Sequence, residues 1–194
     1  MAISIKTPSL KVITGGQTGV DTGAALACVA MGTFPGLLPC DVIFPKGFRR
    51  ETPGKGLIGA EKLAKLVKES GGGAYCTDDE RYDHRTKEVI RRTQALLLIC
   101  PTIDSSPGTA LTYKVATDNG HQTWVFRTVN DKAYWKAEGH AIGYWLKSLL
   151  PHWFVDGRPG INLMVAGPRE SKWPGAEMTA GTILTHVFEE LKSK

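Results

Sequence analysis

A glycine-dense turn between a β-branched segment and an alanine-rich run constrains this chain more than any other feature. After Val12 the sequence reads Ile13-Thr14-Gly15-Gly16-Gln17-Thr18-Gly19-Val20-Asp21 and continues as an alanine-rich run to Met31. Glycine adopts positive φ angles and lets an anion approach the backbone, so this pattern predicts a strand–loop–helix unit that binds an anion. The spacing matches neither a Walker loop nor G-x-G-x-x-G. A tight turn without a ligand is the alternative.

Size and charge limit the possible partners. The chain has 194 residues, which predicts a single domain over residues 1–194 with a substantial core. The formal net charge of +5 favours anionic ligands, but no dense Lys/Arg block indicates nucleic-acid binding. We therefore expect a small phosphate-bearing ligand, and neither nucleic acid nor a membrane as a partner.

The N-terminus and the cysteines indicate the compartment. Residues Met1 to Lys11 lack the apolar core of a secretory signal, and no apolar run reaches membrane-spanning length. The cysteines form no C-x-x-C pair, and the histidines show no metal-ligand spacing. These features predict a reduced, cytoplasmic protein without a dedicated protein metal site. The cysteines are Cys28, Cys40, Cys76 and Cys100.

Strand-like and helix-like segments alternate along the chain. We expect strands at residues 10–14, within 35–43, and at 95–100, 122–129 and 161–166, and helices at 20–31, 57–69, 83–93, 110–119, 131–150 and 175–191. This alternation predicts an α/β protein, a Rossmann-like three-layer α/β/α sandwich with a mostly parallel sheet. Aromatic residues between 131 and 150 predict core or subunit contacts, and we expect a homo-oligomer.

Two further polar loops, a second at residues 101–109 and a third at 167–175, each follow a predicted strand and precede a predicted helix. A cationic loop at residues 44–51 lies between the first and second loops. Loops at the carboxyl ends of parallel strands converge on one crevice in an open α/β sheet. The second loop ends with hydroxyl groups, and the third carries Arg169 and Lys172, which can donate charge-assisted hydrogen bonds. Ser171 can cap the next helix or bind an oxyanion. The candidates in these three loops are Lys46, Gly108, Thr109, Thr112, Arg169, Glu170, Ser171 and Lys172.

Four motifs together resemble the molybdenum carrier family. They are Gly15 to Asp21, Pro45-Lys46-Gly47 with Glu51, Gly108-Thr109-x-x-Thr112, and Asn162-x-x-x-Ala166-Gly167-Pro168-Arg169-Glu170-Ser171-Lys172. That family belongs to the SLOG superfamily of Rossmann-like nucleotide-binding proteins, which also contains the LOG-type cytokinin-activating phosphoribohydrolases. The resemblance runs from about Lys11 to Leu191. It implies a nucleotide or the molybdenum cofactor (molybdopterin) as the ligand at the glycine loops.

The resemblance implies a role for each candidate residue. Backbone N–H groups of the first loop and the hydroxyls of Thr109 and Thr112 would hold a phosphate. Lys46, Arg169 and Lys172 would supply positive charge, and Arg85 would join them if its helix turns it inward. Any metal would then be bound to the pterin. The first-loop candidates are Gly15, Gly16, Gln17, Thr18, Gly19 and Asp21.

The chain departs from the family pattern in three places. Arg85-Thr86 is present, but Glu88-Val89 and Thr93-Gln94 replace an Asn-Val and a Ser-Asp pair. Pro107 replaces a glycine and stiffens the second loop. The stretch 53–79 is longer than in the family, which predicts an extra helix that caps or flanks the site.

The comparison with LOG enzymes bears on catalysis. Their loop resembles P-G-G-x-G-T-x-x-E, and its Glu serves the hydrolysis of an N-glycosidic bond. The matching residue here is Thr112, which cannot act as a carboxylate acid or base. Asp21, Glu51 or Glu170 could replace it. Structural roles are favoured for these three residues, namely a helix cap, a surface ion pair and a partner of Arg169.

The sequence therefore favours a ligand carrier in which no residue is assigned a catalytic role. Two other functions stay open. The first is a nucleotide hydrolase that uses Asp21 or Glu170 in place of the missing carboxylate. The second is a nucleotide-sensing module that binds its ligand and acts through a partner.

Overall fold

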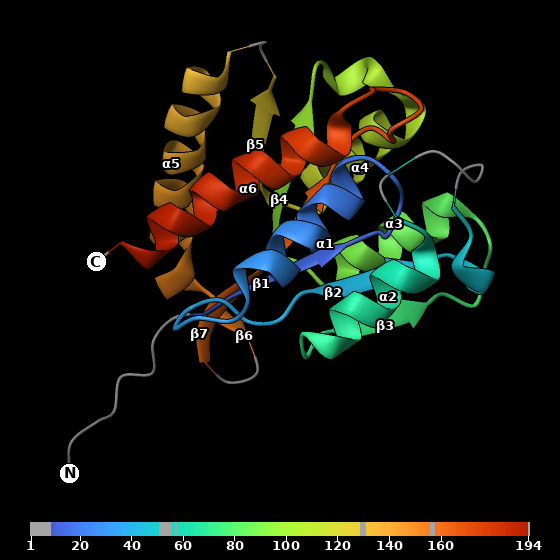
Figure 1. The fold of residues 1–194 in the computed structure, drawn as a ribbon, viewed down its shortest axis with the longest axis horizontal. Coiled ribbons are helices and arrows are strands. Elements are labelled where there is room, and N and C mark those ends of the chain that lie inside the picture. Colours follow the sequence, from blue (N-terminus) through green and yellow to red (C-terminus); the bar gives the residue numbers. More distant parts are fainter. Residues whose placement is uncertain (1–8, 51–55, 57, 129–130, 156–157, 194) are drawn as a thin grey trace.

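The fold is built on a parallel sheet whose last strand lies at its centre. The computed structural model describes residues 9–50, 56, 58–128, 131–155 and 158–193. The parallel strands are β1 (Ser9–Thr14), β2 (Asp41–Phe44), β3 (Gly73–Cys76), β4 (Ala95–Cys100), β5 (Gln122–Arg127) and β7 (Arg158–Ala166). Their order is β3-β2-β1-β7-β4-β5 (Figure 1). A short strand, β6 (Phe154–Val155), pairs antiparallel with the start of β7.

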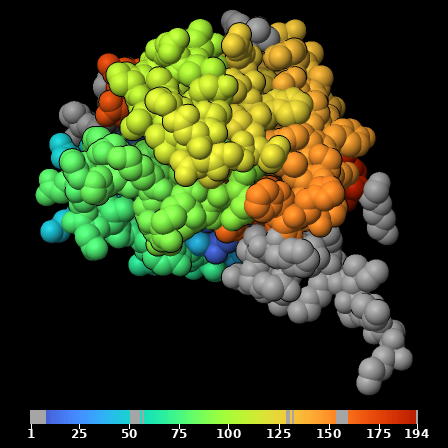
Figure 2. All heavy atoms as spheres, turned by 180° about the vertical axis from the view of Figure 1, so that it is seen from behind, coloured from blue at the N-terminus to red at the C-terminus, as the bar shows by residue number. Residues whose placement is uncertain are grey.

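Helices cover both faces of this sheet. On one face lie α1 (Val20–Met31), α2 (Ala60–Glu69), α5 (Lys132–Leu149) and α6 (Ala176–Lys192) (Figure 1). On the other lie α3 (Tyr82–Arg91) and α4 (Pro107–Asp118), which pack against each other. Figure 2 views the molecule from this side, with α3 in green and α4 in yellow-green. The Rossmann-like three-layer sandwich predicted from the sequence is confirmed.

Each face of the sheet carries its own hydrophobic core. Alternate residues of a strand point to opposite faces, so Leu97 and Ile99 of β4 pack under α1 and α6. Leu96 and Leu98 pack with Val89 of α3 and Ala116 of α4. All six residues of β4 are buried, as predicted for a central strand.

Glycines let the helices of the larger layer approach closely. A Cβ at Gly23 of α1 would overlap the carbonyl oxygen of Glu177 in α6. A Cβ at Gly143 of α5 would lie 2.6 Å from the Cβ of Glu190, also in α6. Real Cβ atoms do not come this close, so bare glycine backbone sets the spacing between these helices.

The sequence expectations fail in a few places. The edge strand β3 was not expected, because its four residues follow consecutive glycines that end α2. Helix α4 begins at Pro107 instead of Ala110, since Ser106 caps it and proline suits the first helical position. The extra helix expected within 53–79 is α2, which contacts α1 and β3 on the face opposite α3 and α4.

The glycine contacts predict opposite effects for two substitutions in this layer. Gly143→Ala should lower the free energy of unfolding by about 1–3 kcal/mol, because the new methyl group overpacks the α5–α6 contact. Gly181→Ala in α6 is the matched control, since its Cβ would lie 3.8 Å from the nearest atom. It should stabilise by about 0.5–1 kcal/mol through helix propensity. Urea denaturation of both variants tests this, and equal effects would contradict the packing argument.

Candidate functional site

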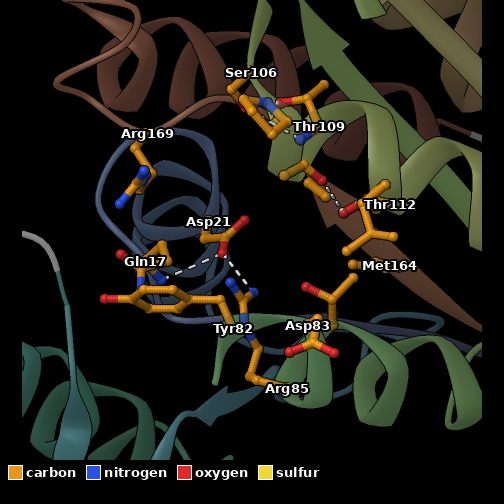
Figure 3. Close-up of a pocket in the computed structure, with 16 residues that line it drawn as sticks. Gln17, Asp21, Tyr82, Asp83, Arg85, Ser106, Thr109, Thr112, Met164 and Arg169 are labelled. Atoms are coloured by element: carbon orange, nitrogen blue, oxygen red, sulfur yellow. Dashed lines mark hydrogen bonds and ion pairs between the residues drawn. The ribbon is translucent and has the colours of Figure 1, made fainter. Parts of the chain in front are cut away.

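A cavity of about 210 Å³ opens at the carboxyl edge of the sheet, between the starts of α3 and α4 (Figure 3). The strands β1, β7 and β4 are adjacent, so the segments that follow them converge at this edge. The first loop, the end of β7 and both helix starts form the wall. The lining residues are Gln17, Asp21, Tyr82, Asp83, Arg85, Thr86, Ser106, Pro107, Gly108, Thr109, Leu111, Thr112, Met164, Ala166, Gly167 and Arg169.

A buried ion pair forms one side of the cavity. Asp21 is 4% exposed and Arg85 is 7% exposed. The guanidinium Nη1 of Arg85 lies 3.0 Å from Asp21 Oδ2, and the backbone N–H of Gln17 donates to the same oxygen at 3.3 Å. Burial raises the pKa of Asp21, and the positive charge of Arg85 opposes this shift. Asp21 therefore pairs with Arg85 and does not cap α1, whose N-cap residue is Gly19.

Gly15 explains why Arg85 points inward. The guanidinium passes directly over this glycine, and a Cβ at position 15 would overlap Arg85 Nη1. A side chain there would exclude the arginine from the cavity. The sequence left the direction of Arg85 open, and the structure turns it toward the first loop.

The start of α4 forms the opposite side of the cavity. Ser106 Oγ accepts the backbone N–H of Thr109 at 3.1 Å and lies 2.8 Å from Thr109 Oγ1. Thr112 Oγ1 donates to the carbonyl of Gly108 at 2.8 Å. The positive end of the helix dipole therefore faces the cavity, with buried hydroxyls beside it. Such an end favours a negatively charged ligand group.

Several backbone N–H groups of the first glycine loop donate hydrogen bonds to other parts of the protein. The N–H of Gln17 donates to Asp21, and that of Gly19 donates to Glu177 Oε1 at 3.1 Å. The N–H of Val20 donates to the carbonyl of Pro168 at 3.2 Å. These amides hold the loop against α6 and the third loop instead of facing a ligand. Gly19 has a φ of 78°, and a Cβ there would overlap the Pro168 carbonyl.

The other candidates in the first loop, Gly16, Gln17 and Thr18, also make contacts within the protein. Gly16 has a φ of 69° and packs beneath the ring of Phe44. Thr18 is buried and lies beside Gly56. Gln17 lines the cavity, and its Nε2 donates to the carbonyl of Arg49 at 3.3 Å. Among these residues, only Gln17 and Asp21 reach the cavity wall.

The third loop contributes one arginine to the cavity. Arg169 lines it, and its Cζ lies 5.8 Å from the ring centroid of Tyr82. Arg49 also contacts that ring, at 5.6 Å. Both oxygens of Glu170 accept N–H groups at the start of α6, from Gly175 and Glu177. The expectation that Glu170 pairs with Arg169 is therefore wrong.

Several predicted cations and polar groups lie away from the cavity wall. Lys46 and Lys172 are exposed, and neither is a lining residue. Ser171 is exposed, and Gly175 is the N-cap residue of α6, so Ser171 does not cap that helix at this position. Glu51 lies outside the described residues. The cavity thus takes its positive charge from Arg85 and Arg169.

Sequence reasoning missed part of the wall. Ser106 and Pro107 carry a recognisable helix-start signal, a serine N-cap followed by proline, which places their helix end at the loop. Tyr82, Leu111 and Met164 have no such local signal, because only the packing of α3 over β2 and of α4 over β4 and β5 brings these residues together around the cavity.

Within the described residues, no group of three or more His, Cys, Asp or Glu is arranged to hold a metal ion. Searched over the same residues, the chain has no helix with the length and apolar character needed to span a membrane.

The Rossmann-like fold, with its cavity at the carboxyl ends of β1, β7 and β4, is that of a ligand-binding protein of the SLOG type. Residues 12–188 match the model of the circularly permutated YpsA SLOG family, and the chain belongs to that family. Its membership in the SLOG superfamily, expected from the motifs, is confirmed.

A solved structure has the same fold as this chain. The chain is similar to a crystal structure called a "putative molybdenum carrier protein" from Syntrophus aciditrophicus SB. The TM-score is 0.66 at 20% identity, over 99% of this chain and 100% of that one. At this identity the likeness shows a shared fold. No curated protein matches the chain significantly.

The buried pair predicts a pH-dependent effect. Arg85→Met leaves Asp21 uncompensated, which should lower the free energy of unfolding by about 3–5 kcal/mol near pH 8. The folded-state pKa of Asp21 then rises further above its unfolded value of about 3.9. A carboxyl group with a raised pKa binds its proton more tightly when folded, so stability falls as the pH rises through that window. The loss should therefore be smaller at pH 5.

Urea denaturation at pH 5 and pH 8 measures this difference. Arg91→Met is the control, because Arg91 is exposed on the same helix and its half-buried partner, Glu88, keeps a second ion pair with Arg92. It should leave the free energy of unfolding nearly unchanged. An equal loss for Arg85→Met at both pH values would contradict the assigned pairing.

Proposed function

We propose that this protein binds and carries a phosphate-bearing small molecule with a planar ring, of the pterin or nucleotide class. The observation that carries the proposal is the cavity at the carboxyl edge of the sheet, where Arg169 and the start of α4 offer positive charge. Anions bind favourably at helix N-termini and beside arginine. The molybdenum cofactor, a pterin phosphate, is the ligand that the carrier resemblance favours.

The donor set fits such a ligand. Arg169 and the α4 start would hold the phosphate, and Met164, Leu111 and Tyr82 supply apolar surface for a ring. The cavity volume of about 210 Å³ is slightly below the roughly 300–1,000 Å³ of typical ligand pockets. It would enclose the ring and leave the rest of a larger ligand at the mouth. Molybdenum, if present, would be cargo bound to the pterin.

A nucleotide hydrolase is the second candidate function, and Asp21 is the observation in its favour. Its pKa is raised by burial, which is typical of groups that donate or accept protons in catalysis. Glu170 is committed to the α6 start, and Thr112 carries no carboxylate. Asp21 and Asp83 are the described carboxylates that line the cavity, and the pKa is raised at Asp21 but lowered at Asp83, so Asp21 is the candidate proton donor for such a hydrolase.

Ligand identity is tested on protein purified gently from a molybdenum-replete host. We expect mass spectrometry to find a pterin phosphate, and elemental analysis to find molybdenum at a matching ratio. Arg169→Ala should lose at least about tenfold in affinity, because a charge-assisted hydrogen bond contributes roughly 1.5–3 kcal/mol. Lys114→Ala removes a cation on the exposed side of α4 and is the charge-matched control. A nucleotide without molybdenum would reject the cofactor and keep the binding site.

Catalysis is tested with nucleoside monophosphates by following base release. The carrier function predicts no turnover above background in the wild type. Turnover that survives in Glu170→Gln and disappears in Asp21→Asn would establish the hydrolase instead. Turnover unaffected by either substitution would place the chemistry outside both candidates.

A further inference from the structure

Asp21 offers one carboxylate oxygen to the cavity. Its Oδ2 accepts two hydrogen bonds, from Arg85 Nη1 at 3.0 Å and from the Gln17 N–H at 3.3 Å. Figure 3 shows this oxygen with both dashed lines and the other oxygen, Oδ1, turned toward the cavity. Within the described part of the chain, Oδ1 accepts no hydrogen bond and is not closed off by its neighbours. A carboxylate oxygen in this position is an acceptor for a ligand donor.

Two buried neighbours of Asp21 each have one polar atom without a partner. These atoms are Gln17 Oε1, an acceptor, and Arg85 Nε, a donor, counted over the described residues. The orientation of the Gln17 amide follows from its other atom, since only Nε2 can donate to the Arg49 carbonyl. Both residues line the cavity. Buried polar atoms normally have partners, so unpartnered ones in a cavity wall indicate where a ligand would bind.

Together these atoms define a hydrogen-bonding pattern of two acceptors and one donor. A complementary ring edge carries two donors and one acceptor. We propose that Asp21, with Gln17 and Arg85, recognises the 2-amino-4-oxo edge of a pterin or the equivalent edge of guanine. This inference rests on the proposed function and names the edge that the site selects.

The pattern discriminates between rings. The edge of adenine places a single amino donor beside an unprotonated ring nitrogen, which would face the carboxylate with its lone pair. Guanine and pterins instead present an amino group, a ring N–H and a carbonyl oxygen side by side. The ring would bind near Met164 and Leu111, with its phosphate toward Arg169 and the start of α4. Gln17 Oε1 and Arg85 Nε are buried just behind the cavity wall, so both side chains would have to rotate for these two atoms to contact the ring.

Isothermal titration with GMP and AMP tests the inference on the full chain. Wild-type protein should bind GMP at least about tenfold more tightly than AMP, because the wrong ring leaves charged groups unpaired. Asp21→Asn should weaken GMP binding by about tenfold or more and change AMP binding less than about twofold. The phosphate-free probe 6-hydroxymethylpterin should compete with GMP, which separates recognition of the ring edge from binding of the phosphate. Arg169→Ala should weaken both nucleotides equally.

A pH titration of wild-type protein covers the case in which Asp21→Asn fails to fold. GMP affinity should fall as the pH is lowered toward the raised pKa of Asp21, and AMP affinity should not. The charged groups facing Asp21 are Arg85 from α3 and Arg50 from the segment after β2. Asp83 and Arg169 line the same cavity, and the pKa of Asp83 is lowered, so it stays ionised over this range.

The outcomes separate this inference from the proposed function. Equal affinity for GMP and AMP, unchanged by Asp21→Asn, would overturn the edge recognition and leave the ligand-binding function standing. Absence of binding by GMP, AMP and the pterin would overturn the proposed function and this inference with it. Selective GMP binding that is lost in Asp21→Asn, with competition by the pterin, would support both.

Discussion

The ion pair between Asp21 and Arg85 is the contact on which the arrangement of the site depends. It joins the first turn of α1 to α3, across the carboxyl edge of the sheet. Charges this deeply buried are tolerated only when they are paired and hydrogen-bonded. The pair therefore fixes Arg85 inward and fixes Asp21 with one oxygen bound and one directed to the cavity. Gly15 is the residue that makes room for it.

The glycine loop supports the site more than it contacts a ligand. A Cβ at Gly19 would overlap the carbonyl oxygen of Pro168, and a Cβ at Gly167 would overlap that of Ile99 near the end of β4. Thr14 Oγ1 donates to the Val165 carbonyl at 3.1 Å, which ties β1 to β7 at the same edge. These contacts exist because the last strand of the chain is inserted between β1 and β4. The first strand–loop–helix unit and the last strand of the sheet therefore lie together at this edge.

Local sequence signals predicted the layers and most elements, because hydrophobic periodicity reflects burial directly. The all-apolar run from Ala95 to Cys100 is a central strand, and the alanine-rich run after Asp21 is a buried helix. The short strand β3 was missed because it is half-exposed and rich in small residues. The partner of the Gly19 amide could not be predicted either. It is Glu177, which lies 158 positions later in the chain, and only the packing of α6 on α1 brings the two together.

Asp21 also shows why binding and catalysis are hard to separate in this architecture. Burial favours its protonated form, and Arg85 favours its ionised form, with burial the larger effect. A ring N–H donated to Oδ1 adds a second interaction that stabilises the ionised form, so ligand binding lowers the pKa. A ring acceptor in that place, such as the unprotonated nitrogen of adenine, would repel the carboxylate and would bind only to the protonated acid. On the proposed binding mode, the ionised carboxylate would therefore select a donor edge, and proton donation by Asp21 would require a pH below its raised pKa.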